Sequence, residues 1–534
     1  MPEKLHDLQI NILMPSSYNQ DRTLRQYRTT MMLPPALPTL HALAEKAGRD
    51  YGLNIAVTHF NERTERGDGY LGSIIKDGTA RKSVTWIPTK SFEIPRAIDL
   101  ARQLKRAGQQ VVLGGPGITL ADLKTYAFLM EEGIPFNVGE AENTAGQIIQ
   151  DVMEDRLKPV YWQRGMVDMR KAPFPKILDL KEHSKTLTRL AALEISKGCP
   201  FNCSYCCVIK LEGQEVSAPR SRNVDEAVAW IEEAFARGYS DIFLTDNNFR
   251  KSFVYSAMKE PLKLLNADLR RKYGRDLSFF VQLDAKPDIL NEVDDLADMG
   301  VKMVFQGYET NDRRVLKLAR KNQNKPEMYQ MIADRFRSRG IMVSSGVMIG
   351  FWPQTPDSIR KDVETSAKFL DLGYPFTVVP LPGSDDFMSA VEEGRIGNWD
   401  PNDYDGTECV FKGLQNMTPE QVKEAYHESF SVLYPQENSG NHVDQQKKPL
   451  LGYMEGRQLP AGRLAEMGLK YAGRPFHLMM DGIPYTHGSV VIRPEDSFRG
   501  IPLKSEDVQF IRKGNTDKER FLLQNAWYPD AVAA

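Results

Sequence analysis

Apolar and polar positions alternate along the first part of the chain in two distinct patterns. Short apolar runs bounded by turn residues predict strands at residues 8–15, 53–60, 82–87, 109–115 and 134–139. Apolar positions with helical spacing predict helices at residues 34–50, 92–108 and 140–155. Strands that alternate with helices are typical of parallel βαβ units. We therefore expect an open, doubly wound sheet over about residues 8–156, with its ligand edge at the carboxyl ends of the strands.

The same alternation resumes after residue 188. Further strands are predicted at residues 189–196, 241–246, 277–282, 301–307, 341–350 and 376–383. The helix predicted at residues 223–238 starts at a good cap, Asn223, with Glu226 three residues later. Six strand and helix units predict a partial (β/α)6 barrel of the TIM type, whose functional groups lie at the strand ends.

These patterns divide the α/β chain into four predicted segments. Residues 1–160 form a doubly wound, Rossmann-like domain, and residues 161–188, rich in proline and lysine, form a linker. Residues 189–387 form the partial barrel, and residues 388–534 form a smaller accessory domain that contacts substrate. The candidate substrate contacts in this last segment are Asp481, Tyr485 and His487.

Composition narrows the classes of function. Of 534 residues, 41% are hydrophobic and 26% are charged, which is ordinary for a globular protein. The formal net charge of −2 supplies no field for a polyanion, so we expect no nucleic-acid partner. No apolar run reaches the roughly 18 residues that a membrane span needs, and the first residues show no signal pattern. We therefore expect a cytoplasmic protein without a membrane partner.

Four of the five cysteines fall within residues 199–207. Cys199, Cys203 and Cys206 follow a C-x3-C-x2-C pattern directly after a predicted strand. Thiolates bind iron-sulfur clusters and zinc, and a closed site of either kind takes four ligands. Three cysteines would leave one iron of a 4Fe-4S cluster open to a substrate or cofactor. Two interpretations stay open beside this one: a zinc site completed by Cys207, and an electron carrier or binding module without enzymatic activity.

The stretch CPFNCSYC resembles the signature of the radical S-adenosylmethionine (radical SAM) superfamily. The resemblance implies that Cys199, Cys203 and Cys206 hold a 4Fe-4S cluster and that S-adenosyl-L-methionine occupies its open iron, beside Tyr205. Three other strand-end residues match positions at which the family contacts S-adenosylmethionine: Asp246, Asn247 and Glu309. A loop turn or a helix cap is the alternative explanation of each short stretch, and the family's usual glycine pair before Asp246 is missing.

The order of a doubly wound domain, a linker and a cysteine-bearing barrel resembles the cobalamin-binding subclass of this superfamily. Gly114 and Gly115 would let the backbone approach a flat ligand, and Gly139 and Glu140 would start a helix facing the same crevice. Tight turns without a ligand are the alternative. The chain has no D-x-H-x-x-G histidine, so the resemblance implies a base-off cobalamin whose lower face meets a group other than imidazole, or a domain that has lost cobalamin.

This resemblance implies a methyltransferase that acts on an unactivated carbon, or phosphorus, of a small molecule or secondary-metabolite precursor. A low-potential donor such as flavodoxin or ferredoxin would supply electrons. Oxidative cyclisation or rearrangement without methyl transfer is the alternative within the same subclass. A methylthiotransferase is disfavoured, because such relatives carry a second cysteine cluster and residues 1–198 contain no cysteine. The sequence assigns no role to Cys207 or Cys409.

Overall fold

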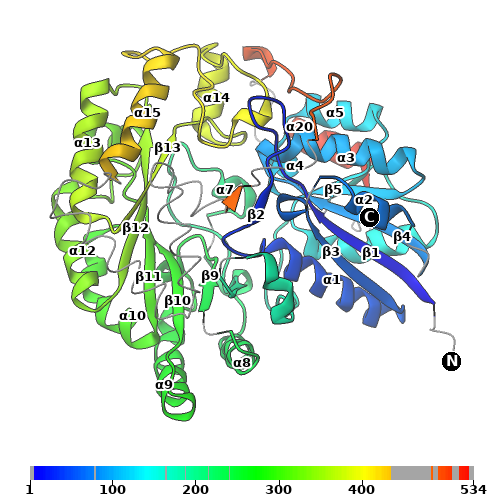
Figure 1. The fold of residues 1–534 in the computed structure, drawn as a ribbon, viewed down its shortest axis with the longest axis horizontal. Coiled ribbons are helices and arrows are strands. Elements are labelled where there is room, and N and C mark those ends of the chain that lie inside the picture. Colours follow the sequence, from blue (N-terminus) through cyan, green and yellow to red (C-terminus); the bar gives the residue numbers. More distant parts are fainter. Residues whose placement is uncertain are drawn as a thin grey trace.

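The computed structural model describes residues 5–433, 483–484, 491–507 and 516–527, apart from residues 66, 77–79, 163–164, 187, 215 and 240. Two parallel sheets lie side by side, the N-terminal one on the right of Figure 1 and the barrel on the left. Asp481, Tyr485 and His487 lie outside the described residues. Within the described ranges, no helix is long and apolar enough to cross a membrane.

The N-terminal sheet has seven parallel strands in the order β15-β7-β6-β5-β4-β1-β3. Five of these strands were predicted: β1 (His6–Met14), β3 (Ile55–Asn61), β4 (Ala80–Pro88), β5 (Gln110–Gly114) and β6 (Phe136–Val138). Side chains of β1 alternate between two cores, with Ile10 and Ile12 on one face and Leu13 on the other. The doubly wound prediction is confirmed.

Helices cover both faces of this sheet. The face that carries Ile10 packs against α1 (Ala36–Tyr51) and α6 (Ala145–Met153). The opposite face packs against α3 (Ile94–Arg106) and α5 (Leu123–Glu131). The shorter elements of this domain are β2 (Tyr27–Thr29), α2 (Tyr70–Lys76), η2 (Ser91–Glu93), α4 (Pro116–Leu120) and η3 (Ala141–Asn143).

Two strands at one end of this sheet, the edge strand β15 and its neighbour β7, were missed by the sequence patterns. β7 (Val160–Trp162) extends the sheet at the start of the segment predicted as a linker. α20 (Thr516–Asn525) then leads into β15 (Ala526–Trp527), which pairs with β7. Strands of two or three residues are too short to show a period, so only their partners reveal them.

The second sheet has six parallel strands in sequential order, and its edge strands do not pair with each other. Its strands are β8 (Leu190–Leu193), β9 (Asp241–Leu244), β10 (Ser278–Leu283), β11 (Val301–Gln306), β12 (Met342–Ile349) and β13 (Leu372–Thr377). The main helices of this region are α8 (Val224–Ala236), α9 (Tyr255–Tyr273), α10 (Val293–Met299), α11 (Arg313–Leu318), α12 (Tyr329–Ser338) and α13 (Pro356–Phe369). The partial barrel is confirmed, and Asn223 caps α8 through the backbone N–H of Glu226, at 3.2 Å.

The sixth barrel strand was predicted too late in the chain. It ends at Thr377, so most of the predicted range 376–383 forms the loop before α14 (Asp385–Glu392). A proline inside a strand cannot donate a backbone hydrogen bond, so Pro375 makes residues 372–377 look unlike a strand. β13 is an edge strand, where a proline is tolerated. After the barrel, α15 (Pro419–Leu433) packs against α13 and β13.

Candidate active site between the two sheets

The three predicted cluster ligands lie on the loop that follows β8. Its backbone is fixed by three hydrogen bonds: Cys206 N–H donates to Cys203 O at 3.1 Å, Ser204 N–H to Ala319 O at 3.1 Å, and Gly198 N–H to Asn247 Oδ1 at 3.0 Å. Two of these bonds come from loops at the carboxyl ends of other barrel strands. The barrel scaffold therefore sets the conformation of the cysteine loop.

The chemistry of these thiols fits an iron-sulfur cluster. Cys199, Cys203 and Cys206 are free and half-buried. Burial, together with the neighbouring Cys207, Cys203 and Cys199, raises the pKa of Cys206 to about 12, so the thiols lie close enough to interact. Among the described residues, no three histidine, cysteine or acidic side chains converge on a single metal ion. Thiols spread along one loop suit the separate corners of a cluster with several irons.

Tyr205 and Glu309, predicted from separate motifs, meet directly. The Tyr205 hydroxyl donates to Glu309 Oε1 at 3.1 Å, and Lys321 Nζ donates to the same Oε1 at 2.8 Å and to the Tyr205 oxygen at 2.9 Å. Glu309 has a φ of 64°, which is unusual for a residue other than glycine and occurs most often at functional sites. Sequence reasoning missed Lys321, because its basic surroundings, RKNQNK, are typical of a solvated loop.

Asp246 supports the backbone that leads into the cysteine loop. This buried carboxylate accepts hydrogen bonds from Ile195 N–H at 3.0 Å, from Ser196 N–H at 2.7 Å and from the Ser196 hydroxyl at 2.5 Å. Burial raises the pKa of Asp246 to about 6, although these hydrogen bonds act in the opposite direction. Asn247 supports the same loop through Gly198. The contacts of Asp246 and Asn247 with S-adenosylmethionine stay predictions.

A second polar cluster at the ends of β9 and β10 was not predicted. Asp284 accepts hydrogen bonds from Asn248 Nδ2 at 3.1 Å and from Arg250 Nε and Nη2 at 2.9 and 3.0 Å. Asn248 Oδ1 is buried and has no partner among the described residues. The one feature of the sequence that could have indicated this cluster is the position of its residues directly after barrel strands, where polar residues tend to be functional.

A cavity of about 410 Å³ lies between the two sheets. On the N-terminal side it is lined by strand ends and turns that include Gly114, Gly115 and Gly139; across it lie Glu194, Lys197, Glu212 and Thr245 of the barrel domain. Gly139 has a φ of 90°, and a Cβ at this position would have no described atom within 4 Å, so the glycine borders open space. Gly115 is needed for packing, because a Cβ there would lie 2.7 Å from Thr89 N. No histidine lines this cavity among the described residues.

Charged residues from both domains form an interdomain ion cluster beside this cavity. It comprises Glu140, Glu142, Glu194, Lys197 and Arg220. Lys197 Nζ lies 3.0 Å from Glu140 Oε1, 2.9 Å from Glu142 Oε1 and 3.6 Å from Glu194 Oε2. Arg220 Nη1 lies 3.2 Å from both oxygens of Glu140. Glu140 was predicted to lie beside cobalamin, and its carboxylate forms ion pairs between the two domains.

Two buried carboxyl groups of this cluster have pKa values that are shifted in opposite directions. Burial acts to raise the pKa of Glu142, but the nearby charge and hydrogen bond of Lys197 outweigh it and the net pKa is lowered. Glu194 lies farther from Lys197, and burial raises its pKa to about 8. Glu194 lines the cavity, so the cavity wall carries a carboxyl group whose pKa is raised by burial.

A comparison with known protein families identifies the barrel region. Residues 193–365 match the model of the radical SAM superfamily. The barrel region of this chain is therefore similar to that superfamily. The match covers the cysteine loop, the Tyr205–Glu309–Lys321 group and four complete barrel strands, β9 to β12.

Relatives and solved structures extend the likeness beyond the barrel region. The bacteriochlorophyllide d C-8(2)-methyltransferase of Chlorobaculum tepidum is 24% identical over 343 residues, which cover 61% of this chain and 72% of that protein. The radical S-adenosylmethionine methyltransferase TsrM of Kitasatospora setae, solved with tryptophan substrate, aligns with a TM-score of 0.58 at 16% identity, over 86% of this chain and 99% of that chain. The cobalamin-dependent S-adenosylmethionine radical enzyme OxsB, solved with aqua-cobalamin, aligns with a TM-score of 0.59 at 13% identity, over 98% and 80%. This chain therefore shares its fold with TsrM and OxsB along most of its length.

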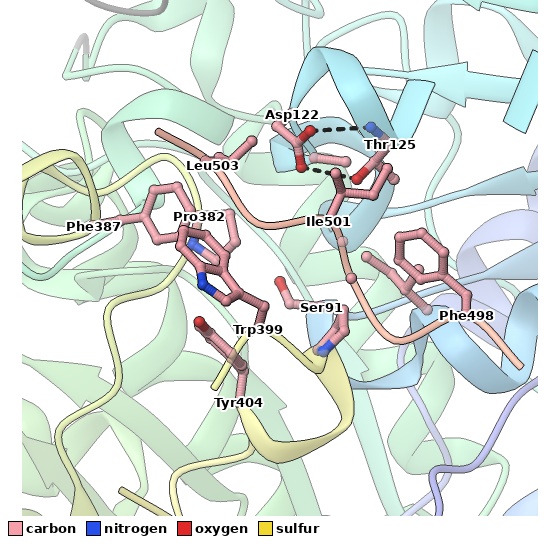
Figure 2. A pocket seen from close by; sticks show the side chains of 15 residues that line it. Ser91, Asp122, Thr125, Pro382, Phe387, Trp399, Tyr404, Phe498, Ile501 and Leu503 are labelled. Carbon is pink, nitrogen blue, oxygen red and sulfur yellow. Dashed lines mark hydrogen bonds between the residues drawn. The ribbon is translucent and has the colours of Figure 1, made fainter. Parts of the chain in front are cut away.

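A second, smaller cavity of about 50 Å³ lies on the other side of the β5–α4 turn (Figure 2). Its apolar wall includes Phe387, Trp399, Tyr404 and Phe498. Asp122 lies at its edge and caps α5, accepting from the backbone N–H and the hydroxyl of Thr125 at 3.0 and 2.8 Å. Residues after the barrel therefore contact the N-terminal domain directly and close this side of the interface between the two domains.

Proposed function

We propose that this radical SAM protein is a cobalamin-dependent methyltransferase that modifies an unactivated carbon, or phosphorus, of a small molecule. The observation that carries the proposal is the shared cavity. The strand ends predicted to bind cobalamin and the residues flanking the cysteine loop line the same space. Methyltransferase relatives and the likeness to TsrM and OxsB support it. A low-potential donor such as flavodoxin or ferredoxin and a cytoplasmic location belong to the same proposal.

The chain's own residues divide this work. Cys199, Cys203 and Cys206 would hold the 4Fe-4S cluster, and Gly114 and Gly139 would form the wall against which cobalamin lies. When bound, these groups and S-adenosylmethionine would supply radical chemistry and a transferable methyl group. The other residues of the site fix distances and exclude water.

Two sets of residues show how distances within the site are fixed. Lys321 holds the carboxylate of Glu309 and the hydroxyl of Tyr205 at one point next to the cysteine loop. The interdomain ion cluster fixes the distance between the strand ends and that loop. Reacting groups held in this way need little reorganisation before they react.

The first test is anaerobic reconstitution with iron, sulfide and hydroxocobalamin, followed by iron and cobalt counts. The proposal predicts about four irons and one cobalt per chain, and Cys203→Ala should lose iron while keeping cobalt. Incubation with S-adenosylmethionine carrying a deuterated methyl group should then label the bound cobalamin. Four irons without cobalt would contradict methyl transfer through cobalamin. Cobalt with 5′-deoxyadenosine formation but no label on cobalamin or product would favour rearrangement.

A further inference from the structure

Trp86 carries a buried hydrogen-bond donor that no described residue uses. It lies on β4 between Ile12 of β1 and Val112 of β5, and its side chain is 5% exposed. Its indole Nε1 has no hydrogen-bond partner among the described residues. Leaving such a group unpaired is costly, so most buried N–H groups in native proteins have a partner. Trp86 also lines the 410 Å³ cavity, so a ligand can supply that partner.

The part of the cavity at Trp86 is an apolar slot between the sheet and two helices. Leu40 of α1, Val112 of β5 and Ile148 of α6 line it with Trp86. The neighbouring polar side chains already have hydrogen-bond partners. The Thr39 hydroxyl donates to Pro35 O at 3.0 Å. Asn137 Nδ2 donates to Gly139 O at 3.1 Å, and Asn137 Oδ1 accepts from the Thr144 hydroxyl at 2.6 Å.

The chemistry of this slot defines the group that it would take. Apolar walls favour an uncharged, flat or aliphatic group, because a charge would be desolvated there without a counter-ion. The indole N–H needs an acceptor, and a nitrogen in the plane of an aromatic ring is an acceptor that brings no charge. Gly114 and Gly139 line the same cavity, so the group would belong to a ligand that continues to the strand ends.

We propose that Trp86 recognises the lower base of cobalamin by donating its indole N–H to the ring nitrogen of that base. The inference rests on the proposed function. A base held by Trp86 in this way would not be free to bind cobalt, because its nitrogen would accept the indole N–H; among the described residues, no histidine lines the cavity. Trp86 is thus a specificity-determining residue that selects cobamides by their lower base.

Three corrinoids separate the possible acceptors. Cobalamin has the ring nitrogen, p-cresolylcobamide has the phosphate, ribose and an aromatic ring without that nitrogen, and cobinamide has only the corrin and its amides. Dissociation constants would be measured by titration calorimetry on the full chain with its cluster reconstituted. One buried hydrogen bond corresponds to about fivefold to tenfold in affinity. We expect cobalamin to bind about fivefold to tenfold more tightly than p-cresolylcobamide.

Trp86→Phe keeps an aromatic ring and removes the donor, so it should reduce that ratio to about one. The matched control is Trp230→Phe, because Trp230 is also buried but its N–H already donates to Pro175 O at 2.8 Å. This control should keep the wild-type ratio, whatever it does to stability. In a spectrum of the ¹⁵N-labelled tryptophan side chains, the signal lost in Trp86→Phe should shift with cobalamin but not with p-cresolylcobamide.

The outcomes separate the two proposals. Equal wild-type affinity for cobalamin and p-cresolylcobamide, both above cobinamide, would assign the acceptor to the phosphate and ribose part and overturn the role of the base nitrogen. Equal affinity for all three would assign it to the corrin amides and overturn it as well. In both cases cobalamin still binds, so the proposed function stands. Failure of every corrinoid to bind would overturn both proposals.

Discussion

Lys197 offers the most direct test of how the two domains are held together. Its side chain is 9% exposed and contacts Glu140 and Glu142 of the N-terminal domain. Lys197→Gln would leave Arg220 as the only cation facing these carboxylates in the interdomain ion cluster. Removing one partner of a buried ion pair costs about 3–5 kcal/mol. A loss of about 3 kcal/mol corresponds to roughly a hundredfold change in an opening equilibrium.

The cost should depend on pH, with a sign that the pKa shifts define. The lowered pKa of Glu142 means that its stabilising contribution is present above its unfolded pKa and is lost as the pH falls through the folded pKa. In Lys197→Gln the largest stabilising charge is gone, only a backbone hydrogen bond and the charge of Arg222 still oppose burial, and the pKa of Glu142 rises. The variant then takes up a proton as the pH falls. The difference from wild type should be largest near pH 8 and shrink toward pH 5.

Hydrogen exchange measured by mass spectrometry is the assay, because it reports local opening in a chain with several domains. Peptides that cover residues 136–144 and 190–198 should exchange roughly a hundredfold faster in Lys197→Gln than in wild type at pH 8. Adding Glu142→Gln should restore part of the protection by removing the unpaired charge. Lys46→Gln is the matched control, because its ion pair with Asp50 is exposed and contributes less than about 1 kcal/mol. Wild-type exchange in Lys197→Gln, or a loss equal at pH 5 and pH 8, would refute the reasoning.

Three further substitutions test the barrel side of the site. Lys321→Met should weaken S-adenosylmethionine binding about tenfold in the reconstituted protein, because a buried carboxylate loses a charged donor; Lys317→Met, on the exposed surface of α11, should leave the dissociation constant unchanged. Asp246→Asn should lower iron incorporation and speed exchange of the cysteine loop by tenfold or more, because two backbone amides lose a charged acceptor; full iron content would contradict this. Cys203→Ser should lose most of its iron by elemental analysis, whereas Cys207→Ser should keep it, and equal losses would contradict the assignment of three ligands.

The sequence predicted the parts of the fold that long periodic segments define. Eleven predicted strands occur in two parallel sheets, and their order follows from the alternation of strands and helices. The exceptions have local causes. β13 contains Pro375, which only an edge position allows, and β7 and β15 are too short to show a pattern.

The candidate site was predictable where a motif names the chemistry. The cysteine loop, Tyr205 and Glu309 were each singled out by a short motif, and the structure brings Tyr205 and Glu309 together, which the motifs did not predict. Lys321, Asp284 and Trp86 could not be found in this way. Their roles depend on partners far away in sequence, and a lysine in a basic run or a tryptophan in a buried strand carries no separate signal.

Two separate sets of contacts join the two domains, and this limits how the site can operate. One set is the interdomain ion cluster beside the shared cavity. In the other, Tyr18 N–H donates to Asn402 Oδ1 at 2.8 Å, Asn402 Nδ2 donates to Tyr18 O at 2.8 Å, and Arg25 pairs with Asp405 at 2.7 Å. Opening the domains as rigid bodies would break one of these sets of contacts. The cavity is therefore better suited to hold two reacting centres at a fixed separation than to close around a substrate by domain movement.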